Sequence, residues 1–262
     1  VVAYYDHGIR GEESHADADF VRDKCRQYGV KLIPGRGELP PHTGEEVARQ
    51  ARYGFLCQAA KKESENGGEE AYIVTAHHQD DLLETIVMNL IRGTGWRGLA
   101  PMSRTDVVRP LIDMTKADVV RYALEHDLDW REDKTNDSPE YWRNRLRAQV
   151  IGRLLTERNK MLALCHGQRR LRVEIDYEVT RYIEQRVDCV DNRPVMYRYD
   201  LIMLPADVAM EILRRLTKGW LTRPQLGQLL LFIKVGKPSK QLSWKRLNVR
   251  LDVRRVYFYP EM

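Results

Sequence analysis

Residues 71–85, Ala-Tyr-Ile-Val-Thr-Ala-His-His-Gln-Asp-Asp-Leu-Leu-Glu-Thr, join a short apolar run to a longer amphipathic one. The run 71–76 has the apolar and β-branched character of a buried strand. Residues 80–91 repeat apolar side chains at helical spacing, and Gly93-Thr94-Gly95 would end a helix there. The stretch therefore predicts a strand followed by a helix, with the polar pair His77-His78 at the turn between them.

The first half of the chain repeats this alternation. Further strands are predicted at 1–5, 30–33 and 107–111, helices at 14–28, 45–62 and 115–126, and a surface loop at 63–70. Strands joined by helices require crossover connections, which predicts the α/β class with a parallel sheet flanked by helices. Ligands of such sheets bind beyond the carboxyl ends of the strands. Asp6-His7-Gly8 and Ala76-His77-His78 both follow predicted strands, so we expect them at one site.

The second half has a different pattern. Residues 142–184 are helical and strongly charged, helices follow near 206–216 and 223–235, and 249–259 alternates like a strand. We therefore expect a catalytic domain at 1–148, and a helical connector with a smaller α+β domain at 149–262. No apolar run approaches the roughly 20 residues of a membrane span. The four cysteines form no C-x-x-C pair, which favours the reduced thiols of a cytoplasmic protein.

Charge is distributed unevenly along the chain. Residues 1–140 hold 18 Lys and Arg against 26 Asp and Glu, whereas 141–173 hold 9 against 1 and 214–255 hold 12 against 1. Two basic blocks on an otherwise acidic chain indicate a polyanionic partner, and nucleic acid is the usual one. A solvated basic face would explain either block alone.

The predicted helix at 80–91 begins with acidic residues that permit two interpretations. Asp80 and Asp81 could cap the helix and complement its dipole. Alternatively, Asp81 and Glu84 lie on one helix face at i, i+3 spacing and could bind a cationic substrate, with Asp80 as a candidate magnesium ligand. His77 and His78 could line a nucleotide pocket, or one could stack while the other is exposed. The sequence contains no Walker A or G-x-G-x-x-G motif.

Several blocks, taken in order, resemble the N-type ATP pyrophosphatase domain of the lysidine synthases. The blocks are Tyr5-Asp6-His7-Gly8, Glu46-x-x-Arg49-x-x-Arg52-Tyr53, His77-His78-x-Asp80-Asp81-x-x-Glu84-Thr85, Arg92-Gly93-Thr94-Gly95, Arg109-Pro110-Leu111, Glu132-Asp133-x-Thr135-Asn136 and Arg143-Asn144-Arg145-Leu146-Arg147. Each block is weak alone, and their common order carries the resemblance through residues 1–150. Leu204-Pro205 and Gly236-Lys237 are more faintly similar to the small tRNA-contacting domain of that family.

The resemblance implies an activity that no single motif shows. ATP, with magnesium, would adenylate the C2 carbonyl oxygen of the wobble cytidine in tRNA(Ile) with a CAU anticodon. The amine of free L-lysine would then displace AMP and give lysidine. The resemblance also implies a homodimer.

The resemblance also implies roles for individual residues. Asp81, Arg52 and Arg145 would be catalytic, and Asp81, Glu84, Arg145 and its neighbour Arg143 would bind lysine. The predicted ATP-binding residues are Asp6, His7, Gly8, His77, His78 and Thr94. The predicted tRNA-binding residues are Arg147, Arg214, Arg215, Lys237, Lys245 and Arg246. The alternating arginines at 143–147 would equally suit a basic surface cluster.

One family motif does not occur in this sequence. The pyrophosphate-binding loop, Ser-Gly-Gly-x-Asp-Ser, would follow a strand ahead of residues 1–5. We expect either that roughly 30–50 residues, one strand–loop–helix unit, precede Val1 in the natural protein, or that this is a relative without ATP chemistry. In the first case the 262-residue chain alone should be inactive. A tRNA thiolase of the same group and a non-catalytic RNA-binding protein are the alternatives.

Overall fold

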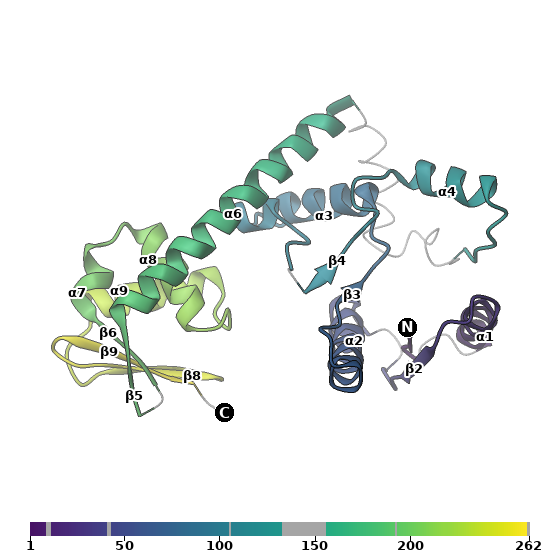
Figure 1. The fold of residues 1–262 in the computed structure, drawn as a ribbon. Coiled ribbons are helices and arrows are strands. Elements are labelled where there is room, and N and C mark those ends of the chain that lie inside the picture. Colours follow the sequence, from purple (N-terminus) through teal and green to yellow (C-terminus); the bar gives the residue numbers. More distant parts are fainter. Residues whose placement is uncertain (9–11, 41–42, 105, 133–155, 192, 261–262) are drawn as a thin grey trace. The chain divides into compact units, whose positions relative to one another are not determined.

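The computed structural model describes residues 1–262 except 9–11, 41–42, 105, 133–155, 192 and 261–262 (Figure 1). The chain divides into two compact units, Val1–His166 and Gly167–Met262. This division falls inside the long helix α6 (Arg158–Arg186). The boundary predicted after residue 148 lies outside the described residues, and each unit is described by itself.

The first unit is built on parallel strand pairs. Strand β1 (Val2–Asp6) pairs in parallel with β2 (Leu32–Arg36), and β3 (Ile73–Val74) with β4 (Val107–Val108). The predicted α/β class is thereby confirmed. Within the described residues the strands form two separate pairs, however, where one continuous sheet was expected.

Helices connect and cover these strands. They are α1 (Glu12–Gln27), α2 (Glu45–Gly67), α3 (Gln79–Ile91) and α4 (Lys116–Glu125), with a 3-10 turn η1 at Trp96–Leu99. The prediction of a surface loop at 63–70 is wrong, because α2 continues to Gly67. Its last turns keep helix-forming residues, and Glu63 pairs with Lys31 at 2.6 Å. The helix ends where Gly68 adopts φ 69° and its N–H donates to the Ser64 carbonyl at 3.0 Å.

Helix α2 packs against both strand pairs. On the β1–β2 side the Phe55 ring lies against Gly35, where an added Cβ would be 2.4 Å from that ring. On the β3–β4 side Tyr53 is buried in a cluster with Ile73 and Val107. The N-terminal half of α2 is therefore held beside the β3–β4 pair, which positions the arginines discussed below.

Helix α3 is the most buried helix of this unit. Its Leu82, Leu83 and Ile86 form a core cluster with Leu162 and Cys165 from the first turns of α6. This packing holds the apolar side of α3 in place, and the N-terminal turn of α3 lies at the carboxyl end of β3. Among the described residues, no helix is both long and apolar enough to cross a membrane.

The second unit has an antiparallel sheet of five strands in the order β5-β6-β9-β8-β7. Their bounds are β5 Val187–Val190, β6 Arg193–Tyr197, β7 Gln241–Trp244, β8 Leu247–Leu251 and β9 Arg255–Pro260. Helices α7 (Arg198–Met203), α8 (Ala206–Leu216) and α9 (Arg223–Val235) lie together on one side of this sheet (Figure 1). The α+β prediction is confirmed, and α8 and α9 have the predicted bounds.

The core of the second unit forms between these helices and the sheet. It contains Leu213 from α8, Leu229 from α9 and Phe258 from β9, each 0% exposed. Arg198 donates to the carbonyls of Ile233 at 2.5 Å and Gly236 at 2.7 Å, and so caps the end of α9. Strands β5, β6 and β7 and helix α7 were not predicted, because such short elements carry little periodicity.

Candidate active site

The N-terminal turn of α3 is tied to the neighbouring α4. The backbone N–H of Gln79 donates to the Met114 carbonyl at 2.8 Å, and that of Lys116 donates to Asp80 Oδ2 at 2.6 Å. His78 precedes the helix, and its N–H donates to Asp81 Oδ2 at 3.0 Å. Asp81 thus caps the start of α3, as one interpretation of the sequence predicted, whereas Asp80 accepts from the start of α4 instead.

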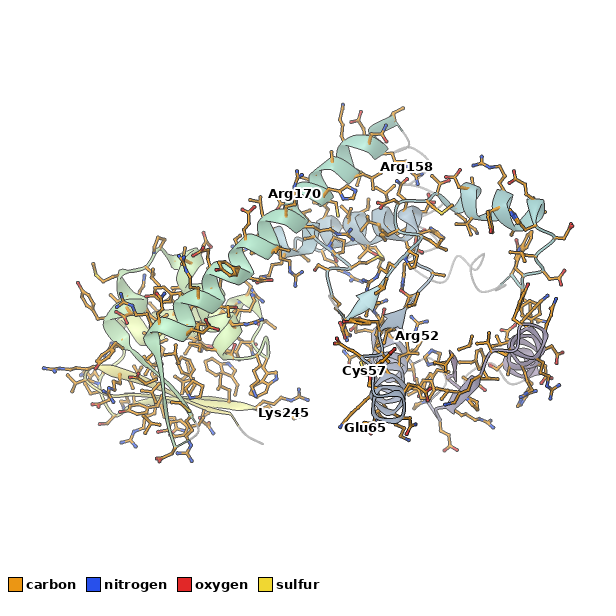
Figure 2. The ribbon with its side chains drawn as sticks, viewed as in Figure 1. Arg52, Cys57, Glu65, Arg158, Arg170 and Lys245 are labelled. Carbon is orange, nitrogen blue, oxygen red and sulfur yellow. The ribbon has the colours of Figure 1, made fainter. Side chains whose placement is uncertain are left out.

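Asp80 is engaged further by an arginine from α6. Arg158 lies at the start of α6 (Figure 2). Its Nη1 lies 3.0 Å from Asp80 Oδ1, and its Nε donates to Gln79 Oε1 at 2.6 Å. Burial alone would raise the pKa of Asp80, but the hydrogen bonds from Lys116 and Arg158 outweigh burial and hold that pKa below its ordinary value. Asp80 is therefore a carboxylate that already has two donors.

This pairing argues against Asp80 as the magnesium ligand that we expected. Both carboxylate oxygens of Asp80 accept hydrogen bonds from Lys116 and Arg158, which leaves little room for a cation that demands near-ideal octahedral oxygen ligation. Nor do three His, Cys, Asp or Glu side chains gather as a metal site anywhere in the described part of the chain. Among the residues that the structure describes, Asp80 and its neighbours do not form a site that fits a protein-held magnesium ion.

His77 follows β3 and lies within electrostatic range of three arginines. Its Nδ1 lies 2.8 Å from Thr75 Oγ1. Burial lowers the pKa of His77 to about 4, against the partial opposition of Asp81, and the positive charges of Arg109, Arg49 and Arg52 lower it further. His77 is consequently a neutral imidazole at neutral pH, in a field set by three guanidinium groups and one carboxylate.

Those arginines are held by their surroundings. Arg52 projects from α2 (Figure 2). The guanidinium carbons of Arg49 and Arg52, both on α2, lie 4.9 Å and 5.9 Å from the centre of the Tyr53 ring. Arg109 follows β4 and donates to the carbonyls of Met102 at 2.9 Å and Val107 at 3.0 Å. Fixed cations of this kind can stabilise the charge of a phosphate without reorganising.

The predicted lysine-binding acids differ in accessibility. The Asp81 side chain is 18% exposed, so an ammonium group could approach it from solvent. Glu84 is 1% exposed and lies one turn further along α3. Asp81 and Arg52 thus both act electrostatically on His77, and Glu84 lies behind Asp81 in the protein interior.

The predicted ATP-binding residues lie in three places. His77 and His78 lie at the end of β3, and His78 Nδ1 is 3.5 Å from Asp81 Oδ2. Asp6-His7-Gly8 lies at the end of β1, in the other strand pair, where the Leu39 N–H donates to the His7 carbonyl at 3.3 Å. The Thr94 N–H donates to the Asn89 carbonyl at 3.1 Å in the turn after α3, at the opposite end of this 13-residue helix from His78, about 20 Å along its axis.

The remaining candidates include residues outside the described chain. Arg143, Arg145 and Arg147 lie in the undescribed segment 133–155. In the second unit Arg215, Lys237, Lys245 and Arg246 are exposed, and Lys245 projects from the β7–β8 turn (Figure 2). Arg214 is only half-buried, and its Nε lies 3.5 Å from Glu211.

Three residues of this site were not among our candidates. Arg49 lies one helical turn from Arg52, and Arg109 directly follows a strand, so helix spacing and strand ends were signals for both. Arg158 lies far away in sequence, inside a charged helix. Nothing in the local sequence distinguishes it from the neighbouring arginines.

Comparison with known proteins adds to this description. A profile of the PP-loop domain matches residues 1–154. The chain is 31% identical to the tRNA(Ile)-lysidine synthase of Solibacter usitatus over 98% of this chain and 59% of the relative. It is 32% identical to that of Thermotoga maritima over 87% of this chain and 54% of the relative. The chain thus spans a little over half the length of these curated relatives.

A solved structure shares the fold. It is the U34-tRNA thiolase NcsA from Methanococcus maripaludis with its 4Fe-4S cluster, at a TM-score of 0.52 and 16% identity, covering 64% of this chain and 61% of that one. At this identity the likeness concerns the fold alone. Since the profile match covers more than half of its residues, and its strands pair in parallel between helices, the chain belongs to the PP-loop domain family.

Proposed function

We propose that the protein ligates lysine to C2 of the wobble cytidine of tRNA(Ile) with a CAU anticodon, and converts ATP to AMP and diphosphate. The observation that carries the proposal is the placement of the Asp81 carboxylate beside His77, within the field of three arginines at the carboxyl end of β3. Membership of the PP-loop domain family and the names of the curated relatives support it.

The proposed reaction has two steps. In the first, the C2 carbonyl oxygen of the cytidine attacks the α-phosphate of ATP, and diphosphate leaves. In the second, the ε-amine of lysine, which loses a proton, attacks C2, and the C2–oxygen bond breaks to release AMP. Arg49, Arg52 and Arg109 would stabilise the charge of the phosphates in both steps.

Asp81 would orient the lysine. A carboxylate that is 18% exposed can accept hydrogen bonds from an incoming ammonium group and hold it near the reacting carbon. Glu84, buried one turn behind, would support the negative potential there. Asp80 accepts hydrogen bonds from Lys116 and Arg158 and would not hold a magnesium ion in either step.

The test measures lysine incorporation by the natural full-length protein. Asp81→Asn removes the charge at constant shape and should lower incorporation into tRNA(Ile) by about 100-fold or more. The matched control is Asp113→Asn, whose side chain is 77% exposed on the loop before α4 and should leave the rate unchanged. Full turnover by Asp81→Asn would remove Asp81 from the lysine site.

The same assay separates the alternatives. Release of diphosphate should require the cytidine-bearing tRNA, and release of AMP should require lysine as well. Release that requires a sulfur donor would indicate a thiolase, and binding of tRNA without any release would indicate a non-catalytic relative. A cytoplasmic location and a homodimer remain part of the proposal, and sedimentation of the purified protein tests the dimer.

A further inference from the structure

The sheet of the second unit has one face without helices. Along β9 the side chains of Val256 and Phe258 are 0% exposed and belong to the core under α8 and α9. Arg255, Tyr257 and Tyr259 alternate with them and therefore project from the opposite face. No described element of this unit covers that face (Figure 1).

Neighbouring strands add to the same face. Tyr197 lies opposite Arg255, and Arg250 lies opposite Tyr257. The Arg255 guanidinium lies 5.2 Å from the centre of the Tyr197 ring, and that of Arg193 lies 4.9 Å from the centre of the Tyr259 ring. Arginine and tyrosine thus alternate across three adjacent strands, and we call these six residues the Arg–Tyr face.

The Arg–Tyr face is ordered by its own contacts. The rings of Tyr257 and Tyr259 are 6.5 Å apart and inclined by 28°. Val195 lies opposite Tyr257, outside the core under the helices, and is nevertheless 1% exposed, so side chains of this face cover it. Because neighbouring side chains already hold the two rings, the tyrosine side chains lose less conformational entropy when a ligand stacks on them.

The charge of the face selects an anionic ligand. Arg193, Arg250 and Arg255 project from it, and Asp188, opposite Val195 on β5, is the acidic side chain of the described strands on the same side. Partly exposed tyrosines beside arginines on an open sheet suit unpaired bases, which have a flat face for stacking and a phosphate for each cation. A duplex keeps its bases stacked inside and would leave the tyrosines unused.

We propose that the Arg–Tyr face binds single-stranded RNA, with unpaired bases stacked on Tyr257 and Tyr259 and phosphates paired with Arg193, Arg250 and Arg255. Within the proposed function, on which this inference rests, the RNA would be an unpaired segment of the substrate tRNA. The face is separate from the basic residues on α8 and in the β7–β8 turn that the sequence indicated.

The test is binding of a fluorescein-labelled 12-nucleotide oligouridine to the 262-residue chain, measured by anisotropy. Tyr257→Ala and Tyr259→Ala should each weaken binding about 5- to 100-fold. Tyr177→Ala is the matched control, because that tyrosine is 66% exposed on α6, away from the sheet. Unchanged affinity in both sheet variants would overturn the proposal.

A second set of variants guards against misfolding. Arg193→Gln, Arg250→Gln and Arg255→Gln together leave the core untouched, and should lower the slope of log affinity against log salt by about 2, or roughly 0.7 for each phosphate contact. An unchanged slope, or equal losses with a 12-base-pair RNA duplex, would refute a single-strand site. The two proposals can fail separately. If the tyrosine variants lose oligouridine binding but the natural full-length protein shows no lysine-dependent activity, this inference stands and the proposed function is wrong.

Discussion

The neutral state of His77 can be tested by changing pH. Burial, together with the charges of Arg109, Arg49 and Arg52, lowers the pKa of His77 to about 4. With that pKa only about 3% of the imidazole is protonated at pH 5.5, against about 90% for an ordinary histidine with a pKa of 6.5. We therefore expect the ring resonances of His77 to stay in their neutral positions until the pH falls below about 5.

The same pKa has a consequence for stability. Because the folded pKa lies below the unfolded value of 6.5, the unfolded state binds the proton more readily, and stability should fall as the pH drops from about 6.5 to 4. The full difference corresponds to about 3 kcal/mol, and partial exposure reduces the expected loss to about 1–2 kcal/mol. Urea unfolding at pH 7 and pH 4.5 measures this loss, and His77→Gln should abolish this part of it.

Arginine variants identify the cause. Arg52→Gln removes one of the positive charges and should raise the pKa of His77, whereas Arg121→Gln, on α4 and paired with Asp118 at 2.6 Å, should leave it unchanged. The NMR titration of the ring reports both. If His77 titrates near 6.5 in the unaltered protein, or if both arginine variants shift it equally, the proposed electrostatic field at the site is wrong.

Three further predictions concern stability, each measured by denaturant unfolding. The Asp80–Arg158 pair should show a coupling free energy of about 1–3 kcal/mol in a double-mutant cycle of Asp80→Asn and Arg158→Met. Since the pKa of Asp80 is lowered, the contribution of the pair to stability should disappear at acidic pH. Purely additive effects of the two substitutions would mean that the pair is not formed. Phe258→Ala should cost about 3–5 kcal/mol, because the ring is 0% exposed, and a loss under 1 kcal/mol would contradict the described core. Gly68→Ala should lower the free energy of unfolding by about 1 kcal/mol, because Gly68 has φ 69°. A stabilising effect would mean that Gly68 does not end α2 in the left-handed conformation.

Local patterns predicted the elements with strong periodicity. Helices α8 and α9 have the predicted bounds because their apolar residues recur at helical spacing over several turns. The predicted end of α2 at residue 62 was wrong, because the residues after Lys62 are polar and polarity alone does not distinguish a loop from an exposed helical turn. Strands of two residues, such as β3, owe their length to a partner strand that no local pattern reveals.

The sequence by itself determined the α/β alternation, the polar cluster after β3 and the basic character of the second unit, because these depend on residues that are neighbours in the chain. Only the tertiary structure decided that Asp80 forms an ion pair with Arg158 and that Glu84 is buried. The tertiary structure likewise decided that Arg49, Arg52 and Arg109 together lower the pKa of His77. It also decided that arginines and tyrosines of β6, β8 and β9 share one face. Charges and rings interact through space, and the distances between residues far apart in sequence are set by packing.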